Sequence, residues 1–189
     1  MAINYKICPN CNSKNVIKIV YGYPSPELLT QAGLGLVRLG GCCVSDIDPE
    51  YACKDCDHEW TKNDSIEYAY QKIMGLKAQV GGFFGPSYFV HLDFISGKVN
   101  WKEENPLTEQ SSGNLSNELI EEIRKKLKAM NLLNWKQKYE NYSVLDGTQW
   151  SLEIEREGRN LHKNGSNEYP SEWDSFCKMI QEITGKPFE

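Results

Sequence analysis

Hydrophobic and polar residues alternate along the second half of the chain in a pattern that predicts an antiparallel sheet. Residues 88–95 are mostly apolar or aromatic and favour a strand, and Ser96-Gly97 favours a turn after it. Residues 98–101 are expected to form a second strand that runs back along the first, so we expect a hairpin. Residues 150–154 alternate between apolar and polar side chains as a half-buried strand does, and residues 159–163 are expected to pair with them. The pattern therefore predicts a sheet of about three or four strands.

Two further segments of this half carry apolar residues at helical intervals. In residues 119–130 the glutamates come early and the lysines late, which matches the helix dipole. Residues 173–183 have one apolar face as well. The polar residues 102–114 are predicted to form a loop. We expect both helices to lie on one face of the sheet, which is an α+β arrangement.

The first half of the chain predicts shorter elements. Residues 16–21 are mainly β-branched or aromatic and favour a strand. Ser25 is expected to cap a short helix whose first residue is Pro26. Residues 36–39 favour another strand, and apolar residues at helical intervals predict a helix over residues 64–80.

Four of the seven cysteines form two Cys-x-x-Cys pairs, at residues 8–11 and 53–56. Zinc prefers four ligands in a tetrahedron, and two thiolates separated by two residues can bind it from one tight turn. The residues that follow the pairs are Asn12 and Asp57, and these are non-glycine types that tolerate a positive φ. Both pairs therefore have the local chemistry of a zinc knuckle, and not only its spacing.

The sequence thus predicts one zinc ion, with the ligands Cys8, Cys11, Cys53 and Cys56. Four thiolates fill the coordination sphere and leave no position for water or substrate, so a structural role is expected. The 41 residues between the pairs exceed the roughly 15–20 of a common motif, and the predicted inserted helix and strand account for the excess. A redox Cys-x-x-Cys, an iron site and ligation by His58 in place of Cys56 are weaker alternatives.

A domain boundary is predicted at residues 81–86, Gly-Gly-Phe-Phe-Gly-Pro, because glycine and proline interrupt regular structure. The predicted fold class is α+β throughout. Residues 1–80 are expected to form a small zinc ribbon with an inserted and a trailing helix, and residues 86–189 a small antiparallel α+β domain of unknown function.

Several segments resemble those of uncharacterised bacterial zinc-ribbon proteins. They are Tyr21-Gly-Tyr-Pro-Ser-Pro-Glu-Leu28, Leu39-Gly-Gly-Cys42, Pro49, and Cys53-x-x-Cys56-x-x-x-Trp60. The resemblance covers about residues 7–60, roughly a third of the chain. It implies a ribbon that holds tetrathiolate zinc, and it implies no particular activity. The second part resembles no family.

Charge and composition narrow the range of partners. The formal net charge is −5 and the sequence pI is near 5.4, so neither half has the basic excess that phosphate contacts need. No apolar run approaches the roughly 20 residues of a membrane helix. The first residues lack a signal-peptide pattern, and an odd number of cysteines argues against a disulfide framework. We therefore expect a cytoplasmic protein that does not bind membranes.

Three functions are compatible with the sequence. The leading hypothesis is a zinc-stabilised interaction or adaptor module that binds a protein, because the metal site is closed. The first alternative is nucleic-acid binding through the ribbon. The second is an enzyme with a site near His91 and Asp93, which share one face of a predicted strand, although an exposed polar face explains these two residues as well.

Overall fold

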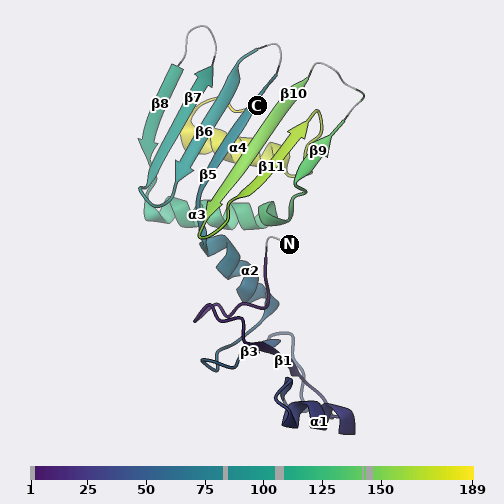
Figure 1. Ribbon diagram of the computed structural model, residues 1–189. Helices are drawn as coiled ribbons and strands as arrows, with labels where there is room; N and C mark the ends of the chain where they lie inside the picture. Colours follow the sequence, from purple (N-terminus) through teal and green to yellow (C-terminus); the bar gives the residue numbers. More distant parts are fainter. Residues whose placement is uncertain (1–2, 83–84, 105–108, 142, 144–146) are drawn as a thin grey trace. The chain divides into compact units, whose positions relative to one another are not determined.

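The protein is α+β, and the computed structural model divides it into two compact units, residues 1–69 and residues 70–189 (Figure 1). The structure describes residues 3–82, 85–104, 109–141, 143 and 147–189. Phe83 and Phe84, which belong to the predicted boundary segment, lie outside the described residues. None of the helices in these ranges combines the length and the apolar character that a bilayer span requires.

The first unit is built on a four-stranded sheet in the order β2-β1-β3-β4. Its elements are β1 (Val16–Val20), α1 (Pro26–Gly33), β2 (Val37–Leu39), β3 (Tyr51–Cys53) and β4 (Glu59–Trp60). Strands β1 and β2 are parallel, whereas β3 is antiparallel to both β1 and β4. The parallel pair needs a crossover connection, which α1 supplies. The inserted helix and strand predicted from the sequence are confirmed.

Helix α1 begins where the sequence predicts. The Ser25 side chain accepts a hydrogen bond from the Leu28 backbone amide at 3.3 Å, and Pro26 occupies the first turn. The helix contains no buried residue. Leu28 and Ala32 are half-buried and its other residues are exposed, so burial of a face contributes little to its stability.

The helix predicted over residues 64–80 is wrong in its second half. Helix α2 comprises Lys62–Gln71, and the next element is a ten-residue strand, β5 (Ile73–Gly82). Leu76, Ala78 and Val80 are buried at every second position, which is the period of a strand. Ile73 and Met74 continue the helical spacing of the residues before them, so periodicity alone cannot locate the change.

The second unit contains a seven-stranded sheet in the order β8-β7-β6-β5-β10-β11-β9. The remaining strands are β6 (Ser87–Asp93), β7 (Lys98–Glu104), β8 (Glu109–Asn114), β9 (Lys138–Glu140), β10 (Thr148–Arg156) and β11 (Leu161–Ser166). The helices are α3 (Asn117–Ala129), the 3-10 helix η1 (Leu132–Asn134) and α4 (Trp173–Thr184). All pairings are antiparallel except that of β9 with β11.

The hairpin and the two helices of this unit are confirmed, but three or four strands is too few. Part of the segment predicted as a polar loop, residues 102–114, forms the end of β7 and the edge strand β8. The sequence of β8, Glu-Gln-Ser-Ser-Gly-Asn, is polar on both faces and its residues are largely exposed. An edge strand of this kind has no hydrophobic alternation by which the sequence could identify it.

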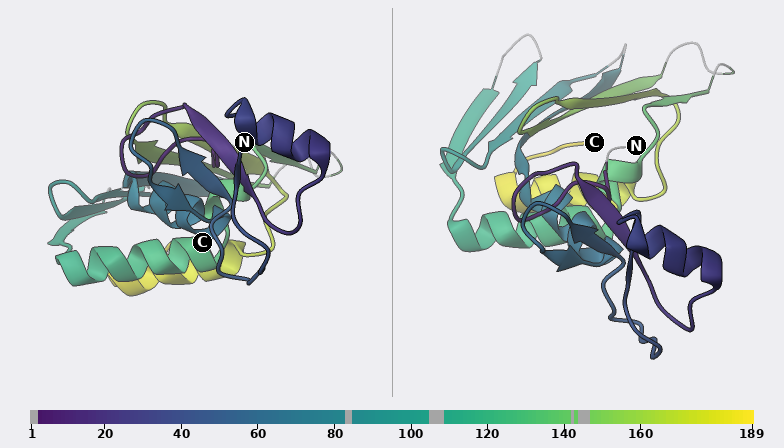
Figure 2. Two further views of the ribbon diagram at one scale, coloured as in Figure 1. Left: turned by 90° about the horizontal axis from the view of Figure 1, so that it is seen from below. Right: turned by 60° about the horizontal axis from the view of Figure 1, so that its bottom comes forward.

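Helices α3 and α4 cover one face of the seven-stranded sheet (Figures 1 and 2). They lie side by side, and Lys126 of α3 pairs with Glu182 of α4 at 2.9 Å. Between the helices and the sheet is an aromatic cluster, in which the rings of Trp150 and Trp173 are 4.6 Å apart. Phe176 packs against Trp135 and Trp173 and is completely buried. This cluster is the centre of the second unit's core.

One lysine of the second unit is buried on this face of the sheet. Lys163 is 5% exposed, and its ammonium donates hydrogen bonds to the carbonyl oxygens of Leu133 and Trp135, at the end of η1. Burial, together with the positive charge of Arg156, lowers the pKa of Lys163 to about 8. The hydrogen bonds of this side chain therefore connect η1 to the sheet, although burying the ammonium costs desolvation energy.

Replacing Lys163 with methionine is expected to change how stability depends on pH. An unfolded lysine has a pKa near 10.4, so between about pH 8 and 10.4 the unfolded wild-type chain binds more protons and its stability rises with pH. From pH 7 to pH 9.5 this rise in the free energy of unfolding amounts to about 1–2 kcal/mol in the wild type, and Lys163→Met should lack it. Urea unfolding at both pH values measures the difference. Equal pH dependence in the two proteins would show that burial does not lower the pKa of Lys163.

Candidate metal centre

The structure brings the four predicted cysteines of the first unit together. Their sulfur atoms all lie within 4.8 Å of one another, and no other such group of metal-binding side chains occurs among the described residues. The Sγ atoms of Cys8 and Cys56 are 3.6 Å apart, and those of Cys11 and Cys53 are 3.5 Å apart. A tetrahedron with metal–sulfur bonds of about 2.3 Å has edges of about 3.8 Å. The four thiols are therefore placed to hold one metal ion.

Both cysteine pairs lie in turns of the same construction. In each turn the backbone carbonyl oxygen of the first cysteine accepts a hydrogen bond from the backbone amide four residues later. The donor is Asn12 in one turn, at 2.9 Å, and Asp57 in the other, at 3.0 Å. These two residues have φ values of 59° and 55°. The positive φ predicted from the residue types is confirmed, and it turns the chain so that both sulfurs of a pair face the same point.

Side-chain hydrogen bonds join the two turns outside the sulfur cluster. Asp55, between the cysteines of the second turn, accepts hydrogen bonds from Ser13 and, at 2.7 Å, from Asn15 of the first. These donors lower the pKa of Asp55, because they stabilise its ionised carboxylate. On the other side the Asn10 amide donates to the Cys56 sulfur at 3.6 Å.

The Asn10 contact also favours the thiolate form of Cys56. This hydrogen bond is the main reason that the pKa of Cys56 falls to about 6, and a backbone amide at His58 adds to it. A thiolate is the form that binds metal. The Asn10 contact therefore favours the metal-binding form of Cys56.

His58 is not a member of the sulfur cluster. Its ring stacks on Trp60 with the centroids 6.0 Å apart, and the residue is exposed. The four thiols alone complete a tetrahedral set, so an ion bound there has no need of an imidazole ligand.

The core around the sulfurs is small. The buried hydrophobic residues among the described part of the first unit are Ile3, Cys8, Ile19, Tyr51, Ala52, Cys53 and Trp60. Two of them are candidate ligands. Trp60 stacks on Tyr51 at 5.8 Å and donates from its indole nitrogen to the Tyr5 carbonyl oxygen. A unit of this size with so little apolar burial needs another source of stability.

The remaining cysteines lie apart from this cluster. Cys42 and Cys43 are exposed in the loop that follows β2, which is not a continuation of the strand. Cys177 is buried on α4, and burial raises the pKa of its thiol to about 12. A buried thiol in this state is a packing residue.

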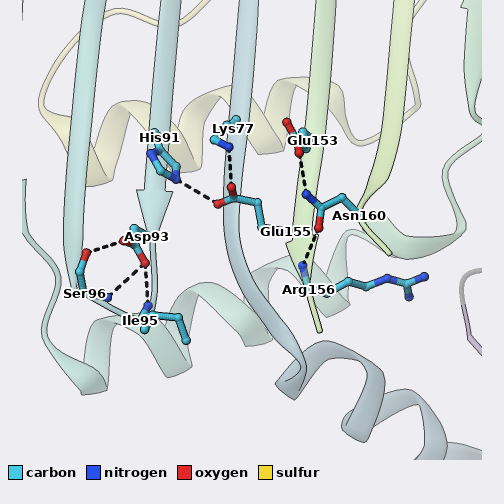
Figure 3. A network of polar contacts seen from close by, with 9 residues as sticks. All are labelled: Lys77, His91, Asp93, Ile95, Ser96, Glu153, Glu155, Arg156 and Asn160. Carbon is cyan, nitrogen blue, oxygen red and sulfur yellow. Dashed lines mark hydrogen bonds and ion pairs between the residues drawn. The ribbon is translucent and has the colours of Figure 1, made fainter. Parts of the chain in front are cut away.

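The enzyme hypothesis placed a site near His91 and Asp93, and the structure separates the roles of these two residues (Figure 3). Asp93 accepts hydrogen bonds from the Ile95 and Ser96 amides and from the Ser96 hydroxyl, which stabilises the turn between β6 and β7. His91 Nε2 instead lies 3.0 Å from a carboxylate oxygen of Glu155 on β10. The same carboxylate pairs with Lys77 of β5 at 2.6 Å.

Although burial opposes it, hydrogen bonds from Lys77 and His91 lower the pKa of Glu155. The contact with this carboxylate holds the His91 ring in place on the sheet. His91 and Lys77 line a hollow of about 800 Å³ on the sheet face opposite the helices, and Asp93 is not part of the lining. Glu155 was not predicted, because which strands pair across a sheet is not encoded in any one strand's pattern.

The comparisons add no family to these observations. No protein-family model matches the chain, and no curated protein matches it.

Proposed function

We propose that the protein is a zinc-stabilised interaction module whose first unit presents a protein-binding surface. The observation that supports this most is a concentration of exposed apolar side chains in the segment between the two cysteine pairs. It comprises Tyr23, Leu29, Leu34, Leu36, Leu39, Val44 and Ile47, which we call the apolar surface of residues 23–47. The described part of the second unit exposes only three large hydrophobic residues, Met74, Ile95 and Tyr169.

Exposed apolar side chains that gather on one surface are typical of a protein–protein contact, and seven of them lie within this short segment. Tyr23 is 98% exposed and Ile47 83% exposed, so neither contributes to the core of the unit. Helix α1, which carries part of the surface, contains no fully buried residue. The most exposed of these side chains therefore contribute little to the fold in which they lie, and binding another chain would remove them from water.

Zinc is the metal that we assign to the four thiols. A tetrathiolate set is a closed structural zinc site, and it suits a reducing cytoplasm in which the cysteines remain free. Zinc bound there would substitute for the core that the first unit lacks and would fix the two ends of the segment that bears the apolar surface. The resemblance to bacterial zinc ribbons supports the same assignment.

The charges of this segment define the partner. Residues 21–50 carry four carboxylates, Glu27, Asp46, Asp48 and Glu50. They carry one cation, Arg38, which is paired with Asp57 and Glu59 at 2.8 and 2.9 Å. The partner that fits is a protein with an apolar contact surface and a basic rim.

The same charges argue against the nucleic-acid alternative. The first unit has 6 Lys and Arg against 9 Asp and Glu, a net charge of −3, and a tetrathiolate zinc adds about −2. Phosphate contacts require an excess of the opposite sign. We therefore retain protein binding as the proposed function.

A photo-crosslinking amino acid at position 36 tests this proposal in cells, with position 95 as the matched control. Leu36 is 61% exposed in the first unit and Ile95 71% exposed in the second, so the two positions differ in location and not in accessibility. We expect crosslinks to a defined partner protein from position 36 and not from position 95. Leu34→Ser introduced beside the crosslinker should reduce the yield at least several-fold.

Two results would contradict protein binding by this surface. One is an equal pattern of crosslinks from both positions, and the other is crosslinking only between two copies of the chain. A zinc assay on each variant verifies that the first unit is still folded, so a lost crosslink can be attributed to the surface.

A further inference from the structure

Cys42 and Cys43 place two sulfur atoms side by side on the surface of the first unit. Their Sγ atoms are 4.0 Å apart, and both residues are exposed. Neither belongs to the cluster of four thiols. The chain therefore offers a second group of thiols that is accessible from solvent.

The loop that carries this pair is anchored on both sides. Before it, the Gly40 amide donates to the Val20 carbonyl oxygen at 2.9 Å. A side-chain carbon at Gly40 would lie 2.3 Å from the Tyr21 ring, so this position requires glycine. After it, the Tyr21 hydroxyl donates to the Pro49 carbonyl oxygen at 2.9 Å. The two thiols are thus presented by a loop whose two ends are both fixed to β1 and its neighbours.

A disulfide is a poor use of these two thiols. Adjacent residues have Cα atoms about 3.8 Å apart, whereas a relaxed disulfide needs at least about 4.4 Å. A metal ion does not impose this limit, because it lies between the sulfurs. Two metal–thiolate bonds of about 2.3 Å span at most about 4.6 Å, and a bent arrangement spans less. The observed 4.0 Å is below this limit and corresponds to a bent S–metal–S angle of about 120° for bonds of this length.

The surroundings select the kind of ion. Residues 42–50 contain Asp46 and Asp48 and no Lys or Arg, and their third carboxylate, Glu50, is paired with Lys62. The two aspartates favour a cation. Among the described residues, no third cysteine, histidine or carboxylate oxygen lies close enough to join the two sulfurs around one ion. Zinc in structural sites has four ligands, so two thiolates alone do not complete its coordination. Two thiolates can complete the coordination of a soft, two-coordinate ion, and Cu(I) is the biological example.

We propose that Cys42 and Cys43 form a second metal site that binds one soft, two-coordinate cation of the Cu(I) class. Binding replaces the two thiol protons with one Cu(I) ion and releases both protons, and no electron is transferred. The site is separate from the tetrathiolate and does not depend on the proposed protein-binding role.

The test is an anaerobic titration of the zinc-loaded full-length protein with Cu(I), supplied as its acetonitrile complex in competition with bicinchoninate. We expect the wild-type protein to withdraw one equivalent of Cu(I) from the indicator while it retains its zinc. The double variant Cys42→Ser/Cys43→Ser should lose this equivalent. Val44→Ser, which changes the same loop and keeps both thiols, should bind as the wild type does.

Zinc measured in the same samples separates the two sites. The proposal is overturned if the double variant withdraws the same equivalent of Cu(I). It is also overturned if each Cu(I) bound by the wild type releases a zinc ion, because copper would then occupy the tetrathiolate. Retained zinc in the double variant shows that its first unit is folded, so loss of copper binding cannot be a folding defect.

Discussion

Replacing Cys53 with serine, or removing the metal with a chelator, is expected to unfold residues 1–69 and to leave residues 70–189 folded. Structural zinc contributes about 10–16 kcal/mol of binding free energy in small zinc domains, which is more than a unit of this size gains from folding. Cys53 is fully buried and forms part of the small core with Tyr51 and Trp60. Its loss therefore removes both a ligand and a packing group.

Limited proteolysis followed by mass spectrometry measures this effect directly. We expect rapid cleavage within the first unit of Cys53→Ser and of the chelated protein, and a resistant fragment that begins near residue 70. Cys43→Ser is the matched control, because it removes an exposed thiol of the same unit that is not part of the cluster. Resistance of the first unit in Cys53→Ser would contradict a structural role for the metal.

The second large effect is expected in the core of the other unit. Phe176→Ala removes a fully buried ring that packs against Trp135, Trp173 and Phe188 at centroid distances of 5.8, 5.7 and 6.3 Å. Creating a cavity in place of a buried phenylalanine costs about 3–5 kcal/mol. For a domain of this length the melting temperature should fall by roughly 10–20 °C.

Thermal unfolding followed by tryptophan fluorescence checks this prediction, since most of the tryptophans lie in the second unit. The first unit should keep its metal in Phe176→Ala. Ile95→Ala is the control, because Ile95 is 71% exposed and its truncation should change stability by less than about 0.5 kcal/mol. A melting temperature unchanged by Phe176→Ala would mean that the aromatic cluster is not the main core.

The cluster of four cysteines could be predicted from the sequence because its determinants are local. Two thiols and the following residue specify each turn, and the positive φ of Asn12 and Asp57 confirms the geometry inferred from residue type. Ser25 at the start of α1 is a local determinant of the same kind. The meeting of the two turns then follows, because one tetrahedral ion needs both of them.

Features that depend on contacts between distant segments could not be predicted in this way. The partner of His91 is Glu155, 64 residues away, and the two meet because both β6 and β10 pair with β5. The sequence predicts a helix where β5 lies, because the first apolar residues of β5 continue the spacing of α2. The apolar surface of residues 23–47 was also missed, since the sequence shows that a residue is apolar and not that it remains exposed.

The most direct test of the central claim is an X-ray absorption spectrum of the purified protein at the zinc edge. A closed structural site predicts one zinc ion per chain, surrounded by four sulfur atoms at about 2.3 Å. The spectrum should be unchanged by Cys42→Ser/Cys43→Ser, which leaves Cys8, Cys11, Cys53 and Cys56 intact. A nitrogen or oxygen ligand in the first coordination shell would contradict the claim, because the site would then be open to solvent or substrate.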